Sequence, residues 1–464
     1  MSSTRLVEHT AVLDCAGQSP PVHTPRRCRP GRLAALVTLV VALLGLMPAL
    51  ATADNPLEIV SKQSIDSRLQ EWTLETPALA DQTKVRILLP TGYASHPFER
   101  HPVLYLLHGT LQDYRWWTDA TDVEEFTEDS DMIVVMPDSG PANAYIDWYN
   151  DGAGGQPQWE TYHVEQLVPL IDHELRTIPL RRARGVAGLS SGGYGAMVYA
   201  ARHPDKFITA HSFSGAVDGN VLAPLIGNDT AAFGSYETNQ IFWRGHNPWD
   251  LAENLSSLDL RFTTGNGQPG PIDPDPFPTP EEDPFAYIEP FIWLCNTNMH
   301  NRLDELAIDH LYYDYGPGTH TTPYFERSLE ESVPLIEATF DNPPAYPTTV
   351  RHYKAIETDY DVFGWHVSLD RNVREFSSLQ NANRNGFEFV GSGSAVVTTP
   401  TRYLPFSWHE VTIETGSGTD VRHIQATSHG TLVIPFEVGP DNQYDQYSPD
   451  EVENPFHHVD VDID

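Results

Sequence analysis

The chain has 464 residues, and its 64 acidic against 28 basic side chains give a formal net charge of −36. A surface this acidic repels nucleic acid and anionic lipid, so neither is expected as a partner. The length exceeds that of one small domain and allows an enzyme core with an added domain. The chain has three cysteines, and no metal-ligand spacing is evident in it. The sequence therefore excludes a disulfide scaffold, and neither a metal nor a cofactor is expected.

The N-terminal segment has the pattern of an export signal. Basic residues at positions 26–32 precede an almost unbroken apolar run over 33–50, and Ala51-Thr52-Ala53 fits the small-x-small rule for cleavage. Residues 1–53 are therefore predicted to be a signal peptide, and the protein is expected to be secreted or associated with the cell envelope. An uncleaved membrane anchor is the alternative, because the apolar run approaches the length that spans a bilayer.

Residues 54–345 alternate between strand and helix patterns. Alternating apolar residues predict an antiparallel hairpin, and the spacing over 161–176 predicts an amphipathic helix. This order predicts an α/β fold with a mostly parallel central sheet and helices on both faces. Ligands of such folds bind beyond the carboxyl ends of the strands. The predicted hairpin covers 68–76 and 84–90, and the buried strands cover 102–107, 132–136, 207–213, 258–263 and 310–315.

The segment Gly188-Leu189-Ser190-Ser191-Gly192 follows a short apolar run and precedes a helical pattern that stops before Pro204. Strand, sharp turn and helix in this order are typical of a nucleophile elbow, so Ser190 is the predicted nucleophile. Glycines flank it because a Cβ there would collide with neighbouring backbone. The N–H of Ser191 begins the helix and is suited to stabilise an oxyanion. A Gly/Ser-rich turn without a catalytic role is the alternative, which the flanking strand and helix disfavour.

A serine nucleophile needs a general base, and that base needs an orienting carboxylate. The chain order in this fold is serine, acid, histidine. His320 follows the last predicted core strand in a Gly/Pro loop and is the predicted base. Two acids remain open on the residues alone. Glu289 lies among apolar residues, where an unpaired carboxylate is costly, whereas Asp273 lies in a Pro-rich acidic loop whose simplest interpretation is a solvated face.

Seven short motifs between residues 68 and 340 carry a more specific signal. They occur in the order in which they are found in the esterase D and antigen 85 mycolyltransferase group of α/β-hydrolases, which this chain resembles. The resemblance implies a serine carboxylic-ester hydrolase, or a related acyltransferase, that works through an acyl-enzyme. The motifs are Leu106-Leu107-His108-Gly109, Asp147-Trp148-Tyr149, Trp159-Glu160-Thr161, Gly188-Leu189-Ser190-Ser191-Gly192-Gly193, His203-Pro204-Asp205-Lys206-Phe207, Gly265-Asn266-Gly267 and Gly318-Thr319-His320.

The same resemblance implies individual site residues. It places the triad acid at Glu289 and the second oxyanion donor at the backbone N–H of Thr110. The mycolyltransferases have an aspartate where this chain has His108, and they follow the catalytic histidine with Ser-Trp where this chain has Thr321-Thr322. Both departures disfavour trehalose recognition, so hydrolysis of a small-molecule or cell-envelope ester is favoured over acyl transfer to a sugar or glycerol hydroxyl. A non-catalytic surface protein on a hydrolase shell is a third interpretation, which the intact motifs oppose.

The substrate pocket is the least constrained part of the site. His108, Arg115 and Trp116 are expected to line it, although neighbouring tryptophans more often pack against each other. Residues 219–248 form a long connection between two core strands and are expected to cap the site. Cys295 lies in an apolar run and is expected to be a small core residue and not a nucleophile.

From about residue 350 the pattern changes to short alternating strands with Gly/Asn turns. Residues 346–440 are therefore predicted to form a β-rich, sandwich-like domain. This domain is expected to stabilise the hydrolase by packing on it, and contact with a cell-wall glycan or polymer is the alternative. Residues 441–464 are expected to be an acidic, disordered tail. The predicted strands of the domain are 388–390, 395–399, 409–414, 422–426 and 431–438.

Overall fold

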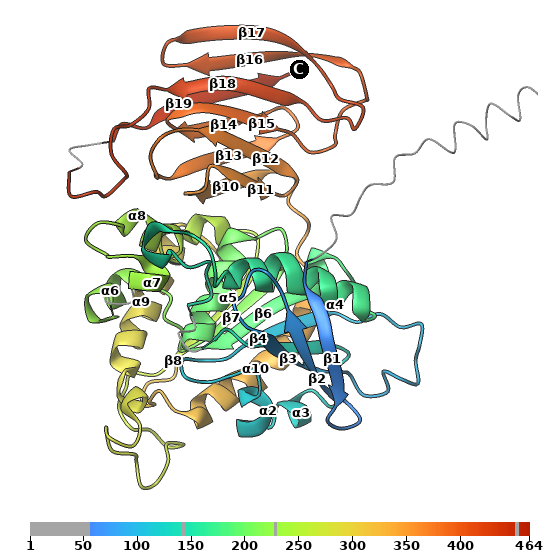
Figure 1. Ribbon diagram of the computed structural model, residues 1–464, viewed down its shortest axis with the longest axis vertical. Helices are drawn as coiled ribbons and strands as arrows, with labels where there is room; N and C mark the ends of the chain where they lie inside the picture. The colour runs from blue at the N-terminus through green and yellow to red at the C-terminus, as the bar shows by residue number, and fades with distance from the viewer. Residues whose placement is uncertain (1–55, 141–143, 227–229, 451–453) are drawn as a thin grey trace, which may run out of the picture. The chain divides into compact units, whose positions relative to one another are not determined.

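The computed structural model describes residues 56–140, 144–226, 230–450 and 454–464 (Figure 1). The predicted signal peptide, residues 1–53, lies outside the described residues. Among the residues that the structure describes, no helix has both the length and the apolar character needed to cross a bilayer.

A nine-stranded mixed sheet organises the first part of the described chain, in the order β1-β2-β3-β5-β4-β6-β7-β8-β9. The first strands pair antiparallel, including the predicted hairpin β2–β3, and β3 pairs antiparallel with β5. From β5 onward all pairs are parallel, so the predicted α/β fold class is confirmed. The strands are β1 (Glu58–Ser64), β2 (Leu69–Glu75), β3 (Thr83–Leu88), β4 (Val103–Leu107), β5 (Ile133–Pro137), β6 (Arg184–Leu189), β7 (Thr209–Phe213), β8 (Asp259–Thr264) and β9 (Leu311–Asp314).

Helices cover both faces of this sheet (Figure 1). Successive residues of β4 point to opposite faces, so Tyr105 and Leu107 belong to one apolar cluster and Leu104 and Leu106 to another. The first cluster includes buried residues of η2, α4, α5 and α9, and the second includes buried residues of α2, α3 and α10. The predicted helix over 161–176 is the π-helical segment η2 (Thr161–Leu167) continued by α4 (Val168–Glu174). The other helices are α2 (Trp116–Ala120), α3 (Val123–Phe126), α5 (Ser191–Arg202), α6 (Gly219–Ile226), α7 (Thr230–Phe233), α8 (Gln240–Gly245), α9 (Glu289–Glu305) and α10 (Thr322–Asp341), with short turns η1 (Asn150–Gly152), η3 (Arg181–Ala183), η4 (Ala252–Leu255) and η5 (Pro284–Tyr287).

The C-terminal part consists of two antiparallel sheets, ordered β10-β13-β14-β19-β16-β17 and β11-β12-β15-β18. Their inward-facing residues form one shared apolar core, in which Trp365, Phe389 and Ile434 are fully buried. Alternate burial along the strands is the pattern expected of a sandwich-like arrangement. The strands are β10 (Val350–Ala355), β11 (Asp359–Val362), β12 (Trp365–Asp370), β13 (Ser377–Asn383), β14 (Gly386–Gly391), β15 (Gly393–Thr398), β16 (Trp408–Thr415), β17 (Gly418–Gln425), β18 (Val433–Gly439) and β19 (His457–Ile463).

The prediction of a disordered tail over residues 441–464 is wrong for the last part of this segment. Strand β19 lies inside the six-stranded sheet and pairs with β14 on one side and β16 on the other. Its Val459, Val461 and Ile463 are buried, whereas the aspartates between them are exposed. The acidic composition conceals a period-two apolar pattern, and that pattern decides the structure because one face of the strand is covered.

We expect Val461→Asp to lower the free energy of unfolding by about 3 kcal/mol or more, because it buries a carboxylate among apolar side chains. Asp460→Ala in the same strand is the matched control, since Asp460 is exposed and its neighbours in register are Glu388 and Glu414. Thermal or denaturant unfolding of the two variants measures the difference. Equal stability of both would contradict the assignment of β19 to the sheet interior.

Candidate active site

Ser190 lies on the sharp turn between β6 and α5, with backbone φ of 53° and ψ of −120°. This conformation is strained for a residue with a side chain, and such strain is characteristic of functional sites. A Cβ on Gly188 would lie 2.4 Å from the carbonyl oxygen of Gly192, and one on Gly192 would lie 2.5 Å from the carbonyl oxygen of His108. Backbone cannot yield to such contacts, so the predicted need for glycine at both positions is confirmed.

His320 connects the predicted nucleophile to a carboxylate. It lies between β9 and α10, and its Nε2 is 2.9 Å from Ser190 Oγ while its Nδ1 is 2.6 Å from Glu289 Oε2. When the serine hydroxyl donates to Nε2, Nδ1 carries the ring proton and donates it to Glu289. The ring also packs edge-on against Phe325, with 4.9 Å between centroids. The structure therefore brings the three predicted triad residues into one hydrogen-bonded chain.

Glu289 is fully buried at the first position of α9. Its Oε1 accepts hydrogen bonds from Ser214 Oγ (2.7 Å), Thr264 Oγ1 (3.0 Å) and the Gly265 backbone N–H (2.9 Å). Three donors on one oxygen satisfy the buried carboxylate, and the helix N-terminus adds to this stabilisation. They also fix the carboxylate so that Oε2 faces His320.

Asp273, the other candidate for the acid, does not contact His320 in the structure. Its Oδ1 accepts from the hydroxyls of Thr319 and Thr321, the two neighbours of His320 in the chain. Its Oδ2 accepts from the Gly270 N–H at 2.6 Å and from the Tyr324 hydroxyl at 3.3 Å. The prediction of a solvated acidic face for this loop is therefore wrong at Asp273. Its carboxylate binds the residues on either side of His320.

We expect Asp273→Asn to lower kcat by about tenfold to a hundredfold and to change KM little, because loosening the loop misplaces His320 in the transition state. The amide retains the size of the carboxylate but replaces one acceptor oxygen with an NH₂ donor. That NH₂ group then faces two groups that now donate to Asp273, and both hydrogen bonds are lost. Asp275→Asn is the control, because Asp275 is exposed on the same loop. Steady-state kinetics on one aryl ester separates kcat from KM, and equal kcat values for both variants would contradict this positioning role.

Ser190 opens into a cavity of about 120 Å³. Thr110 lines this cavity, and Ser191 begins α5, whose first backbone N–H groups have no acceptor within the helix. The two predicted oxyanion donors come from different segments: Thr110 lies in the loop after β4, and Ser191 is the first residue of α5. The lining residues are Gly109, Thr110, Gln112, Leu189, Ser190, Asp283, Phe285, His320, Thr321, Thr322 and Phe325.

The three predicted pocket residues do not line the cavity. His108 is buried, donates from Nδ1 to the Gly109 carbonyl and accepts the Ser139 N–H at Nε2. Arg115 pairs with Asp113 at 2.6 Å, and Trp116 packs edge-on against Trp117 with 5.0 Å between centroids. Each of these side chains has its contacts elsewhere, so residue type alone was a poor guide to which residues line the pocket.

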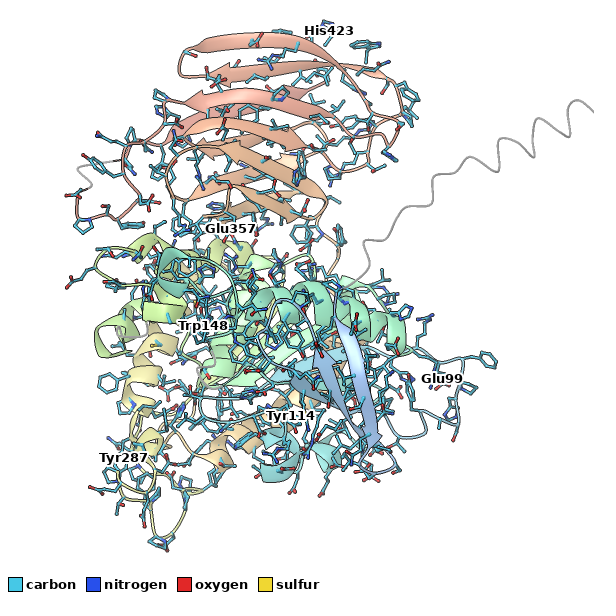
Figure 2. All side chains as sticks on the ribbon, viewed as in Figure 1. Glu99, Tyr114, Trp148, Tyr287, Glu357 and His423 are labelled. Atoms are coloured by element: carbon cyan, nitrogen blue, oxygen red, sulfur yellow. The ribbon has the colours of Figure 1, made fainter. Side chains whose placement is uncertain are left out.

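The cavity wall instead includes Gln112, Asp283 and Phe285, which sequence reasoning missed. Gln112 Oε1 accepts the Gly109 N–H at 2.7 Å and so shapes the loop after β4. The Asp283 side chain caps the short turn η5. Tyr287, the last residue of this turn, is labelled in Figure 2. The cap expected from residues 219–248 supplies no lining residue among the described side chains, and the end of the Pro-rich segment takes that place. The sequence signal that could have indicated these wall residues is the Pro-rich segment shortly before Glu289.

Cys295 is buried in α9, as predicted. Burial raises the pKa of its thiol to about 12, and the nearby Asp218 adds to the shift. A thiol with so high a pKa remains protonated at neutral pH and is unsuited to be a nucleophile.

Residues 76–336, more than half of the chain, match the family described as Putative esterase. The esterase Rv1288 of Mycobacterium tuberculosis strain H37Rv is 38% identical over 164 residues, which span 34% of this chain and 35% of that protein. The match thus covers about a third of the relative's length. The diacylglycerol acyltransferase/mycolyltransferase Ag85A of Mycobacterium gordonae is 27% identical over 345 residues, covering 70% of this chain and 94% of that protein. A solved ferulic acid esterase is 21% identical with a TM-score of 0.44, covering 58% of this chain and 97% of that one.

The family match covers the sheet from β3 to β9, both oxyanion candidates and the chain that joins Ser190, His320 and Glu289. The expected resemblance is therefore confirmed. The chain belongs to the Putative esterase family of the α/β-hydrolase superfamily and is homologous to mycobacterial esterases and antigen 85 mycolyltransferases.

Proposed function

We propose that the protein is a serine carboxylic-ester hydrolase, with Ser190 as nucleophile, His320 as general base and Glu289 as the orienting acid. The single observation that carries this proposal is the hydrogen-bonded chain from Ser190 Oγ through His320 to Glu289, at 2.9 Å and 2.6 Å. Family membership supports it, because esterases act on ester substrates.

In the proposed reaction, Ser190 Oγ attacks the ester carbonyl carbon while its proton passes to His320 Nε2. The carboxylate of Glu289 stabilises the imidazolium, and the N–H groups of Thr110 and Ser191 stabilise the oxyanion. Collapse of the tetrahedral intermediate breaks the bond to the alcohol oxygen, which takes the proton from His320. Water then repeats the attack on the acyl-enzyme with His320 as base, which releases the acid and restores Ser190.

The size of the cavity favours compact acyl groups. Its volume of about 120 Å³ lies below the range of about 300–1,000 Å³ that is usual for small-molecule pockets. Phe285 and Phe325 provide apolar wall, and Asp283 places a carboxylate at the same wall, which disfavours anionic substrates. We infer that short, uncharged esters are preferred over long acyl chains.

Acyl transfer is the second candidate, because the mycobacterial relative that covers 70% of this chain is named an acyltransferase. Both reactions share every step up to the acyl-enzyme, and they differ only in whether water or a sugar or glycerol hydroxyl attacks it. A panel of aryl esters with acyl chains of two to about sixteen carbons, run with and without glycerol and trehalose, separates them. Free acid as sole product supports hydrolysis, whereas acyl glycerol or acyl trehalose at the expense of acid supports transfer.

Secretion is a further part of the proposal. The basic, apolar and small-residue regions of 1–53 support export and cleavage before Asp54. N-terminal sequencing of the exported protein tests this: a start at or near Asp54 supports secretion, and retention of residues 33–50 supports a membrane anchor. For the C-terminal strands we keep stabilisation of the hydrolase as the proposed role, with glycan or polymer contact as the alternative.

A further inference from the structure

Three side chains that commonly bind transition metals meet near the C-terminal end of α9. His300 and Asp304 are four residues apart on this helix and therefore lie on one face of it. His310 follows the helix and directly precedes β9. One possible ligand atom from each of the three residues lies within 4.8 Å of the other two.

Hydrogen bonding determines which ring nitrogen of His310 is free to bind a metal ion. Its Nδ1 is 2.9 Å from the Ile308 carbonyl oxygen, which accepts only, so Nδ1 carries the proton and Nε2 carries a lone pair. This is the arrangement usual for metal-binding histidines, whose second nitrogen donates to a carbonyl or carboxylate. The lone pair of Nε2 points at His300 Nδ1, 2.7 Å away.

Asp304 lies beside the same imidazole that contacts His310. Its Oδ2 is 3.7 Å from His300 Nε2, and the Nδ1 of that ring is 2.7 Å from His310 Nε2. The three side chains therefore form one compact group of possible ligands.

Aromatic packing holds both rings in place. His300 stacks on Tyr312 with 4.3 Å between centroids and 10° between planes. His310 meets Phe262 edge-on, with 6.2 Å between centroids and 80° between planes. Two imidazoles that are already oriented lose little conformational freedom when they bind a common ion.

We propose that His300, Asp304 and His310 bind a divalent transition-metal ion, for which Zn²⁺ is the test ion. Two imidazoles and one carboxylate suit zinc and disfavour Ca²⁺ and Mg²⁺, which take oxygen ligands. Zn–N bonds of about 2.0–2.1 Å place two tetrahedral ligand nitrogens roughly 3.4 Å apart, so the rings separate slightly on binding. Water completes the coordination, because the Asp304 side chain is 64% exposed.

The proposed ion is remote from the ester chemistry. Glu289 and His300 are eleven residues apart on α9, which at about 1.5 Å per residue separates them by roughly 16 Å. Metal binding links the end of α9 to the start of β9 across residues 306–309. The ion therefore stabilises the helix that presents Glu289 and takes no part in attack on the ester.

Zinc titration of the tag-free mature protein after chelator treatment tests the proposal, with thermal melting and esterase rate measured on the same samples. We expect binding of one equivalent at micromolar Kd or tighter, a rise in Tm of roughly 3 °C at saturation and an unchanged rate. His310→Ala is expected to weaken binding at least tenfold and to remove the rise in Tm. The same one-equivalent binding by His310→Ala, or no binding by the wild type below about 0.1 mM, overturns the proposal.

Two further variants make the result specific. Asp304→Asn changes an exposed side chain, so it leaves the fold intact while removing the anionic ligand and weakening zinc binding. His457→Ala with His458→Ala removes the other histidine pair, on β19, and is expected to bind zinc as the wild type does. Loss of binding in that double variant instead assigns the metal to β19 and overturns the α9 site.

Discussion

Ser190→Ala is expected to lower kcat on a simple aryl ester by about 10⁵-fold or more and to abolish labelling by a fluorophosphonate probe. The change removes the only atom that forms the acyl bond in the proposed reaction. Ser190 is already held at φ 53° by the elbow, and alanine meets the same backbone strain, so the fold is expected to persist. Probe labelling followed by intact-mass measurement reports the adduct, and thermal melting reports the fold.

Ser191→Ala is the matched control for this experiment. Its hydroxyl is buried next to the nucleophile, but only its backbone N–H has a role in the proposed mechanism. This variant is expected to retain labelling and most of kcat. Labelling of Ser190→Ala at the wild-type rate would show that another residue is the nucleophile, and an unlabelled wild type would favour the non-catalytic surface protein.

Glu289→Gln is expected to lower kcat by about 10⁴-fold with little change in KM, a loss comparable to that of other serine hydrolases with an amidated triad acid. Three donors surround Oε1, so the amide oxygen of glutamine remains with Ser214, Thr264 and Gly265. Its NH₂ group then faces His320 Nδ1 and donates to it. This places the ring proton on Nε2, where the histidine cannot accept the proton of Ser190.

Saturating kinetics on one aryl ester, with melting as the fold control, measures this effect. Glu281→Gln provides the same chemical change on the exposed Pro-rich segment and is expected to match the wild type. Asp273→Asn is expected to fall between the two, since it positions the His320 loop without contacting the ring. A near-normal kcat for Glu289→Gln beside an inactive Asp273→Asn would identify Asp273 as the triad acid and refute the proposed triad.

The features that the sequence determined by itself are those encoded within a few neighbouring residues. The elbow at Ser190 needs only a strand, two glycines that avoid backbone collisions and a helix, and all lie within about twenty residues. The place of His320 after the last core strand likewise made it the predicted general base. The parallel sheet followed from the strand–helix alternation, because parallel strands need long crossovers between them.

The tertiary structure alone decided which groups from distant segments meet. Glu289 and Asp273 are both carboxylates between Ser190 and His320, and only the packing of α9 against β8 and the residue after β7 brings Glu289 to the imidazole. The cavity wall from Asp283 and Phe285 and the His300–His310 contact depend on the same long-range packing. Strand β19 shows the same limit. Its acidic residues indicate disorder until β14 and β16 pair with it and the shared core of the two sheets buries its apolar face. Local patterns specify elements, but contacts between them depend on burial and register that no short segment encodes.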